Sequence, residues 1–316
     1  MSGTAAGAPA HTPDELFAIL GNGTRLAILD ELWRARGHSE NPSLDALPFS
    51  ELRKRVGMRD SAQFNYHLKQ LVGPFVRRTD DGYALTRAGE RVMSAVFAES
   101  LSDGLVLDAV PIDDPCPLCE GRVVLDCGTD AAPYLLLARC TECPGAWREA
   151  GLPSGILMSV DPLLPVGVSD RSLEEMYRAQ YRWTKYSLLS MMDGVCPECS
   201  GPVTSTARFC ETHPGPPSPP TLCDDCDTIF PLLFFNVCGV CNNYSQTPVD
   251  RHLLTHPTVA AFYADRGYDT WGHDWLRIQV ETVREVVPIP GDPPSFRVVV
   301  TVDGDRLEAT LDEGGR

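Results

Sequence analysis

The spacing of the cysteines constrains the fold of this chain more than any other feature of its sequence. All 12 cysteines lie between Cys116 and Cys241, and ten of them form five Cys-x-x-Cys pairs. Such a turn offers two thiolates to one metal ion, and two turns complete the tetrahedron that a structural zinc prefers. We therefore expect the middle of the chain to fold around metal ions.

The first two pairs have the arrangement of a zinc ribbon. Cys119 and Cys140 are separated by 20 residues, which include apolar runs at 122–125 and 134–137. Two strands joined by a turn between two knuckles form a ribbon. Free or redox-active thiols are the alternative, but no β-α-β pattern accompanies the pairs, so zinc is favoured. Cys127 is left over and is expected to be a small buried residue.

The second cysteine region contains eight candidate ligands when His213 is counted with Cys210. Eight ligands suit two tetrahedral ions, so the whole chain is expected to hold about three zinc ions. Nested, interleaved and sequential pairings all fit the spacing. Complete ligation leaves no open position for water, so the zinc is expected to be structural and the protein not an enzyme. The predicted ligands are Cys116, Cys119, Cys140, Cys143, Cys196, Cys199, Cys210, His213, Cys223, Cys226, Cys238 and Cys241.

Helical periodicity near the N-terminus predicts a helix-turn-helix. Helices are expected at 13–20, 24–36, 50–56 and 60–72, separated by capping residues and by glycines. A hairpin with an Asp-Gly turn is expected over 75–85, followed by a largely helical stretch at 87–107. The fold class predicted for the chain is therefore α+β, multidomain, with a winged helix-turn-helix at its N-terminal end.

The fourth of these helices has one apolar face and one polar face. Phe64, Leu68 and Leu71 should pack into a core, and His67 beside them should be packed or half-buried. The free face and the hairpin carry side chains that can read base edges or hold phosphate. The alternative is an ordinary solvated helix beside a charged hairpin. The predicted DNA contacts are Ser61, Gln63, Asn65, Tyr66, Lys69, Arg77 and Arg78.

Charge is unevenly distributed along the chain. The net charge is -16, which by itself argues against binding to phosphates. Residues 51–91, however, contain nine basic and five acidic residues, a local charge of +4. Only three lysines accompany 24 arginines, and this acidic, lysine-poor composition resembles that of proteins from salt-loving archaea, where concentrated salt screens self-repulsion.

Three segments resemble a known family. LGNGTRLAIL at 20–29, NYHLKQL at 65–71 and YALTRAG at 83–89 are similar to the winged helix-turn-helix of ArsR-type transcriptional regulators, in particular to haloarchaeal versions with C-terminal zinc ribbons. The resemblance implies a winged helix that binds double-stranded DNA, commonly as a homodimer. Residues 1–115 lack the cysteines with which the founding members of the family sense metals. Metal-responsive derepression is therefore not implied.

These patterns predict five segments. They are a DNA-binding winged helix-turn-helix at 1–110, a zinc ribbon at 111–165, a connecting helix at 166–194, a two-zinc Cys/His module at 195–257, and a β-rich segment at 258–316 with alternating apolar residues from Trp275. The N-terminus has no basic leader followed by an apolar run, and no apolar stretch is long enough for a bilayer, so a soluble, cytoplasmic protein is expected.

Two functions are compatible with this organisation. The first is a DNA-binding transcriptional regulator whose zinc modules dimerise, bind an effector or contact an unknown protein. The second is a protein-interaction adaptor that uses the winged helix to bind proteins. The local positive charge of residues 51–91 favours the regulator.

Overall fold

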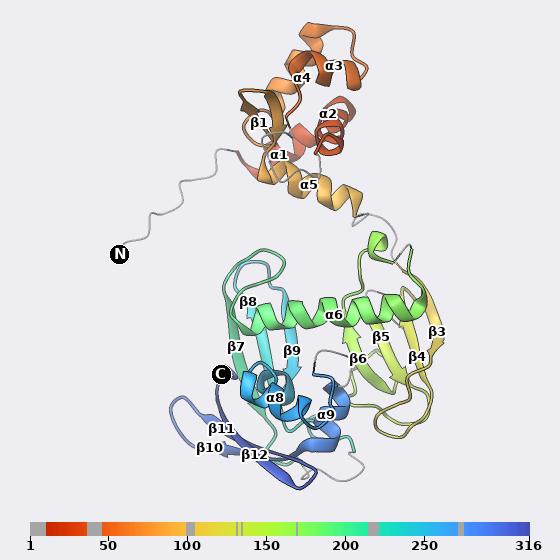
Figure 1. Cartoon of the computed structure of the whole chain (residues 1–316), viewed down its shortest axis with the longest axis vertical. Helices are drawn as coiled ribbons and strands as arrows, with labels where there is room; N and C mark the ends of the chain where they lie inside the picture. The colour runs from red at the N-terminus through yellow and green to blue at the C-terminus, as the bar shows by residue number, and fades with distance from the viewer. Residues whose placement is uncertain are drawn as a thin grey trace. The chain divides into compact units, whose positions relative to one another are not determined.

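The computed structural model describes residues 11–36, 46–98, 105–130, 132–133, 135–168, 170–213, 221–270 and 275–316. The chain divides into two compact units, residues 1–102 and 103–316. Its fold is a mixture of helices with several small sheets, and the described residues form four sheets, all antiparallel (Figure 1). Across these same residues, none of the helices combines the length and the apolar character needed to cross a membrane.

The first unit consists of helices around one core, with a hairpin between the last two helices. Its elements are α1 (Pro13–Leu20), α2 (Gly23–Arg34), α3 (Phe49–Arg55), α4 (Ser61–Leu71), β1 (Val76–Thr79), β2 (Gly82–Leu85) and α5 (Arg87–Phe97). Side-chain caps fix several helix starts: Asn22 begins α2, Asp60 begins α4 and Thr86 begins α5, each accepting a hydrogen bond from a backbone N–H group of the first turn. Of the largely helical stretch expected at 87–107, the helix α5 ends at Phe97 and Leu107 already lies in a strand, whereas residues 99–104 lie outside the described residues.

The hairpin turn differs from the expected Asp-Gly turn. Thr79 pairs with Gly82, so the turn consists of Asp80 and Asp81, and the glycine is the first residue of β2. Gly82 has φ +140, and a Cβ there would lie 2.2 Å from the carbonyl oxygen of Leu47. The glycine is thus required because Leu47 forms an isolated antiparallel bridge with Tyr83 beside the hairpin, with hydrogen bonds of 2.9 and 3.0 Å.

The second unit contains three sheets and four helices among its described residues. The strands of its first sheet, in the order β3-β4-β5-β6, are β3 (Leu107–Ile112), β4 (Val123–Cys127), β5 (Leu136–Cys140) and β6 (Ile156–Val160). The second sheet contains β7 (Val203–Phe209), β8 (Leu232–Cys238) and β9 (Tyr244–Pro248), and the third β10 (Val283–Ile289), β11 (Ser295–Val302) and β12 (Asp305–Asp312). The helices are α6 (Leu173–Met192), α7 (Val249–Leu253), α8 (Pro257–Ala264) and α9 (Trp275–Thr282), and a short 3-10 turn, η2 (Pro165–Gly167), precedes them.

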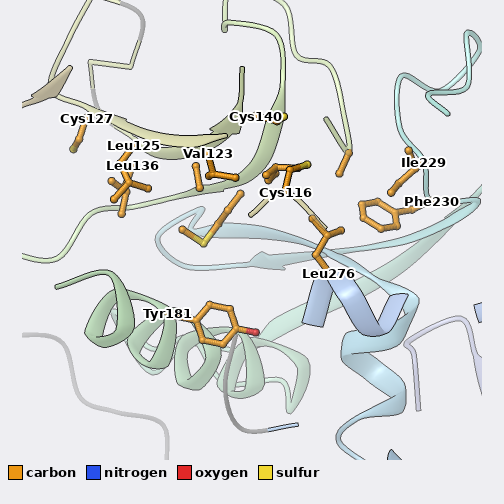
Figure 2. Packing of buried hydrophobic residues seen from close by; sticks show 14 of the residues in the cluster. Cys116, Val123, Leu125, Cys127, Leu136, Cys140, Tyr181, Ile229, Phe230 and Leu276 are labelled. Atoms are coloured by element: carbon orange, nitrogen blue, oxygen red, sulfur yellow. The ribbon is translucent and has the colours of Figure 1, made fainter. Parts of the chain in front are cut away.

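Helix α6 is part of a shared core as well as a connection between segments. Its Met176 and Tyr181 are buried together with Leu125 and Leu136 of the first sheet and with Phe230, just before β8. Figure 2 shows the Tyr181 ring extending from the helix below these apolar side chains. Residues from the predicted ribbon, the predicted connecting helix and the predicted two-zinc module therefore form one hydrophobic core.

The C-terminal segment is less strand-rich than its alternating pattern suggested. Residues 275–282 form helix α9, and the expected β structure begins only at Val283. Leu276, Val280 and Val283 lie at i, i+4 and i+7, which also fits a helix. Leu276 and Val280 pack in the hydrophobic cluster of the first sheet, and Val283 packs in the cluster of the third sheet. The three strands that follow pair antiparallel, as the hairpin pattern predicted.

Candidate metal centres

Three groups of four side chains in the second unit are arranged as metal sites. They are Cys116, Cys119, Cys140 and Cys143; Cys196, Cys199, Cys238 and Cys241; and Cys210, His213, Cys223 and Cys226. Within each group the candidate ligand atoms lie within 4.8 Å of one another. All twelve predicted ligands fall into these groups, and His213 occupies the place that its spacing from Cys210 suggested.

The separations between ligand atoms fit a tetrahedral ion. With metal–sulfur bonds of about 2.3 Å, two sulfurs on a tetrahedron lie about 3.8 Å apart, and a sulfur and an imidazole nitrogen about 3.6 Å. The Sγ–Sγ distances are 3.7 Å for Cys116–Cys143 and 3.6 Å for Cys196–Cys241. His213 Nδ1 lies 3.4 Å from the Sγ atom of Cys226. A disulfide would need about 2.05 Å, so these thiols are positioned for a metal and not for each other.

Four of the knuckles share one backbone conformation, in which the residue after the second cysteine is left-handed. These residues are Glu120, Ser200, Asp227 and Asn242, with φ of 62, 61, 55 and 59. In each knuckle this left-handed residue donates its N–H to the carbonyl of the first cysteine. The N–H of the first cysteine in turn donates to the carbonyl of the residue that comes next after the left-handed one. The turn points both thiols to one side, so the spacing alone fixes half of each site.

The second and third groups are nested, which settles the pairing that the spacing left open. Strands β7 and β8 are antiparallel, with Val203 opposite Cys238 and Phe209 opposite Leu232. Cys196 and Cys199 precede β7, so they meet Cys238 and Cys241 at one end of the pair. At the other end, the N–H of Cys210 donates to the carbonyl of Pro231, beside the Cys223 knuckle.

The surroundings of the candidate ligands shift their pKa values in different directions. Around Cys196, burial acts to raise the pKa, but backbone N–H groups of Cys199 and Glu198 outweigh it and lower the pKa to about 6. Burial, together with the neighbouring thiols, raises the pKa of Cys226 to about 12. Burial lowers the pKa of His213, so its imidazole is held neutral, as a metal ligand must be. A divalent cation would offset the charge of clustered thiolates.

Two family comparisons cover nearly all of the chain. Residues 113–316 match a family described as a domain of unknown function, DUF7351, and this match covers more than half of the chain. The chain belongs to the DUF7351 family. Residues 13–96 match a second domain of unknown function, DUF7347. No curated protein and no solved structure matches the chain.

In the DUF7351 region, backbone pairing joins the third metal group to the segment that follows the first. Ala146 and Arg148, just beyond Cys143, exchange hydrogen bonds of 2.9 and 2.7 Å with Ile229 and Asp227. The Arg148 guanidinium also lies 2.8 Å from the Asp227 carboxylate. The three metal groups are therefore parts of one continuous framework.

Other polar residues of the DUF7351 region lie outside the metal groups. Cys127 is buried in β4, where burial raises its pKa, as expected of a thiol without a ligand role. His252 accepts a hydrogen bond from Thr247 and donates one to the carbonyl of Gly315, and His256 caps α8. Asp250 is fully buried, and within the described residues neither of its carboxylate oxygens has a hydrogen-bond partner. No sequence pattern indicated this buried carboxylate.

In the DUF7347 region, the predicted DNA contacts lie on one helix and one hairpin. Ser61, Gln63, Tyr66 and Lys69 are exposed on α4, whereas Asn65 is half-buried. The opposite face of the helix is buried in the core through Phe64, Leu68, His67 and Leu71. Arg77 and Arg78 are exposed on β1.

Proposed function

We propose that this protein is a DNA-binding transcriptional regulator, with a winged helix-turn-helix of the ArsR type in residues 11–98. The exposed face of α4 carries this proposal. It presents Gln63, Tyr66, Lys69 and Gln70, and the helix contains no acidic residue. Side chains of these kinds bind base edges in the major groove. The proposed base contacts are the exposed side chains of α4, with the half-buried Asn65 beside them.

The support behind α4 favours recognition over an ordinary solvated helix. Phe64 is fully buried and meets Phe49 of α3 edge-to-face, with ring centroids 5.1 Å apart. The Asp60 carboxylate accepts hydrogen bonds from the N–H groups of Ala62 and Gln63, which fixes the start of the helix. A recognition helix that is fixed at its buried face and at its N-terminus keeps its exposed side chains in register with the base edges of a groove.

The three metal centres support the proposal that the second unit is zinc-dependent. Two sets of four cysteines and one set of three cysteines with a histidine, each with its ligand atoms within 4.8 Å of one another, suit zinc better than the hard cations, which prefer oxygen ligands. With four protein ligands each, the sites offer no position for a substrate. We therefore assign the zinc ions, about three per chain, a structural role and propose no enzymatic activity.

The division of charge between the two units supports different roles for them. Residues 1–102 contain 12 basic and 12 acidic residues, whereas residues 103–316 contain 15 basic and 31 acidic ones. The whole net charge of -16 thus belongs to the second unit, and the first is neutral with a local excess of cations. We therefore expect DNA to bind to the first unit and not to the acidic second unit. We propose a homodimer in a reducing, salt-rich cytoplasm, as the haloarchaeal resemblance implies.

Selection of genomic fragments by the purified, zinc-loaded chain tests this function. Enriched fragments should bind about fivefold or more weakly when Gln63→Ala removes a base contact worth about 1 to 3 kcal/mol. A scrambled duplex should be bound equally by both proteins. Gln246→Ala is the matched control, because Gln246 is also an exposed glutamine but lies on β9 in the second unit.

The adaptor is the second candidate, and the charge of the second unit favours it. An acidic unit with Trp183 and Tyr186 exposed on α6 suits a basic protein partner. Failure to enrich any DNA fragment would contradict the regulator and leave this alternative.

A further inference from the structure

The cations of the first unit differ in how far they are already engaged. Arg53 donates to the carbonyl of Arg59, and Arg55 pairs with Glu51 at 2.7 Å. On the hairpin, Arg77 Nε donates to the carbonyl of Leu85. Within residues 46–98, the remaining engaged cations are Arg78, 5.5 Å from the centroid of the Tyr83 ring, and Arg87, 3.1 Å from Glu90.

Four cations within residues 46–98 have no such partner among the described residues. Lys54, Arg59, Lys69 and Arg91 are all exposed, and none has a hydrogen bond, ion pair or ring contact within the described part of the unit. Lys54 lies in the last turn of α3, and Arg59 immediately precedes the capping residue of α4. The hydrogen bond from Arg53 to the Arg59 carbonyl, at 2.6 Å, fixes the backbone between the two helices.

The tip of the hairpin carries the opposite charge. Its two turn residues are Asp80 and Asp81, both exposed. A phosphate approaching this tip would meet two carboxylates before it met Arg77 or Arg78, both of which already have contacts within the hairpin. Among the described residues, the corner between α3 and α4 has exposed cations without a partner, whereas the tip of the hairpin has two exposed carboxylates.

We propose that Lys54 and Arg59, with Lys69, hold the DNA backbone, and that the hairpin tip makes no phosphate contact. This inference rests on the proposed DNA-binding function and specifies which surface of the first unit meets phosphate. In a helix-turn-helix the first helix crosses the backbone while the second enters the groove. Lys54 and Arg59 lie where these two helices meet, and Lys69 lies in the last turn of α4.

Salt dependence measures phosphate contacts without knowledge of the operator. The logarithm of the binding constant falls with the logarithm of salt concentration, by about 0.9 for each phosphate that the protein neutralises. We expect Lys54→Gln and Arg59→Gln each to reduce this slope by about 1 on a duplex of arbitrary sequence. Arg78→Gln and the double variant Asp80→Asn/Asp81→Asn should leave the slope unchanged. The protein used is the full, zinc-loaded chain.

Arg91→Gln is the matched control, because it removes an equally exposed and unpartnered cation from α5. Figure 1 draws α5 at one end of this unit and α3 with α4 at the other. The slope should remain at its wild-type value in this variant. An equal reduction in all four cation variants would indicate a long-range effect of net charge and would overturn the local contact.

The remaining outcomes distinguish failure of this inference from failure of the proposed DNA-binding function. If the wild-type chain binds DNA and the slope falls only in the Arg78→Gln variant, the hairpin holds the backbone and the inference is wrong while DNA binding stands. If the wild-type chain binds neither this duplex nor any genomic fragment at any salt concentration, the proposed function fails and the inference fails with it.

Discussion

The buried carboxylate of Asp250 makes a quantitative prediction about pH. Burial raises the pKa of Asp250 to about 7, although the charge of Arg251 acts to lower it. An aspartate in an unfolded chain has a pKa near 3.8. Because the folded-state pKa is the higher one, the folded protein keeps a proton that the unfolded chain has lost. The contribution of this group to the free energy of unfolding is therefore fully present below about pH 3.8 and is lost as the pH rises to about 7.

The magnitude follows from the difference between these pKa values. About three pKa units, at about 1.4 kcal/mol each, give a cost of about 4 kcal/mol for holding the ionised carboxylate above pH 7. Asp250→Asn keeps the shape and removes the ionisation. The stability of the variant relative to wild type should therefore increase by about 1.4 kcal/mol per pH unit up to about pH 7 and then become constant.

Urea unfolding of the second unit, in the zinc-loaded chain from about pH 6 to about pH 9, measures this difference. The range keeps the metal ligands deprotonated, and effects common to both proteins cancel. His252→Gln provides a control of opposite sign, because burial lowers the pKa of His252 to about 4. Its destabilising effect should shrink as the pH falls from about 7 to about 6, because the unfolded chain then gains a proton on this histidine that the folded protein does not. A difference between Asp250→Asn and wild type that does not vary with pH would refute the reasoning.

Three further predictions concern the metal centres and the backbone. His213→Ala should release one of three zinc ions and His213→Cys none, as counted by native mass spectrometry, because only the third group contains His213; loss of two ions from His213→Ala would contradict independent binding at the three groups. Asp126→Ala should destabilise the second unit by about 3 kcal/mol in urea unfolding. The reason is that Asp126 is buried, lies 2.6 Å from Arg139 and accepts a hydrogen bond from the N–H of Ala109. An effect below about 1 kcal/mol would show that this ion pair contributes little. Gly82→Ala should lower the thermal midpoint of the first unit and reduce its free energy of unfolding by about 2 kcal/mol or more. The added Cβ would lie 2.2 Å from the carbonyl oxygen of Leu47. An unchanged midpoint would mean that Leu47 does not pair there.

Local patterns predicted the parts of the structure that depend on neighbouring residues. Cysteine spacing identified the knuckles because one tight turn places both thiols, and the apolar period in α4 predicted which face is buried. The partner of each knuckle in the second region depends on the pairing of β7 with β8, which joins residues about 30 positions apart. No spacing within a single knuckle contains that information.

Other differences arose where one pattern suits two structures. Leu276, Ile278 and Val280 alternate as in a strand, but Leu276 and Val280 are also one helical turn apart, and packing selected the helix. An Asp-Gly pair usually forms the hairpin turn, yet here the close approach of Leu47 places Gly82 in the strand. Asp250 was not predicted because its burial depends on α7 packing beneath distant elements.

The β7–β8 ladder has a consequence for how this family can change in length. Seven residue pairs, from Val203 opposite Cys238 to Phe209 opposite Leu232, separate the second metal group from the third. Inserting one residue in either strand would turn every following side chain to the other side of the sheet and displace one knuckle from its partner. The ion of that metal group would lose two of its four ligands. Relatives that keep both metal groups should therefore have no insertions or deletions within these strands, and should vary in length outside them.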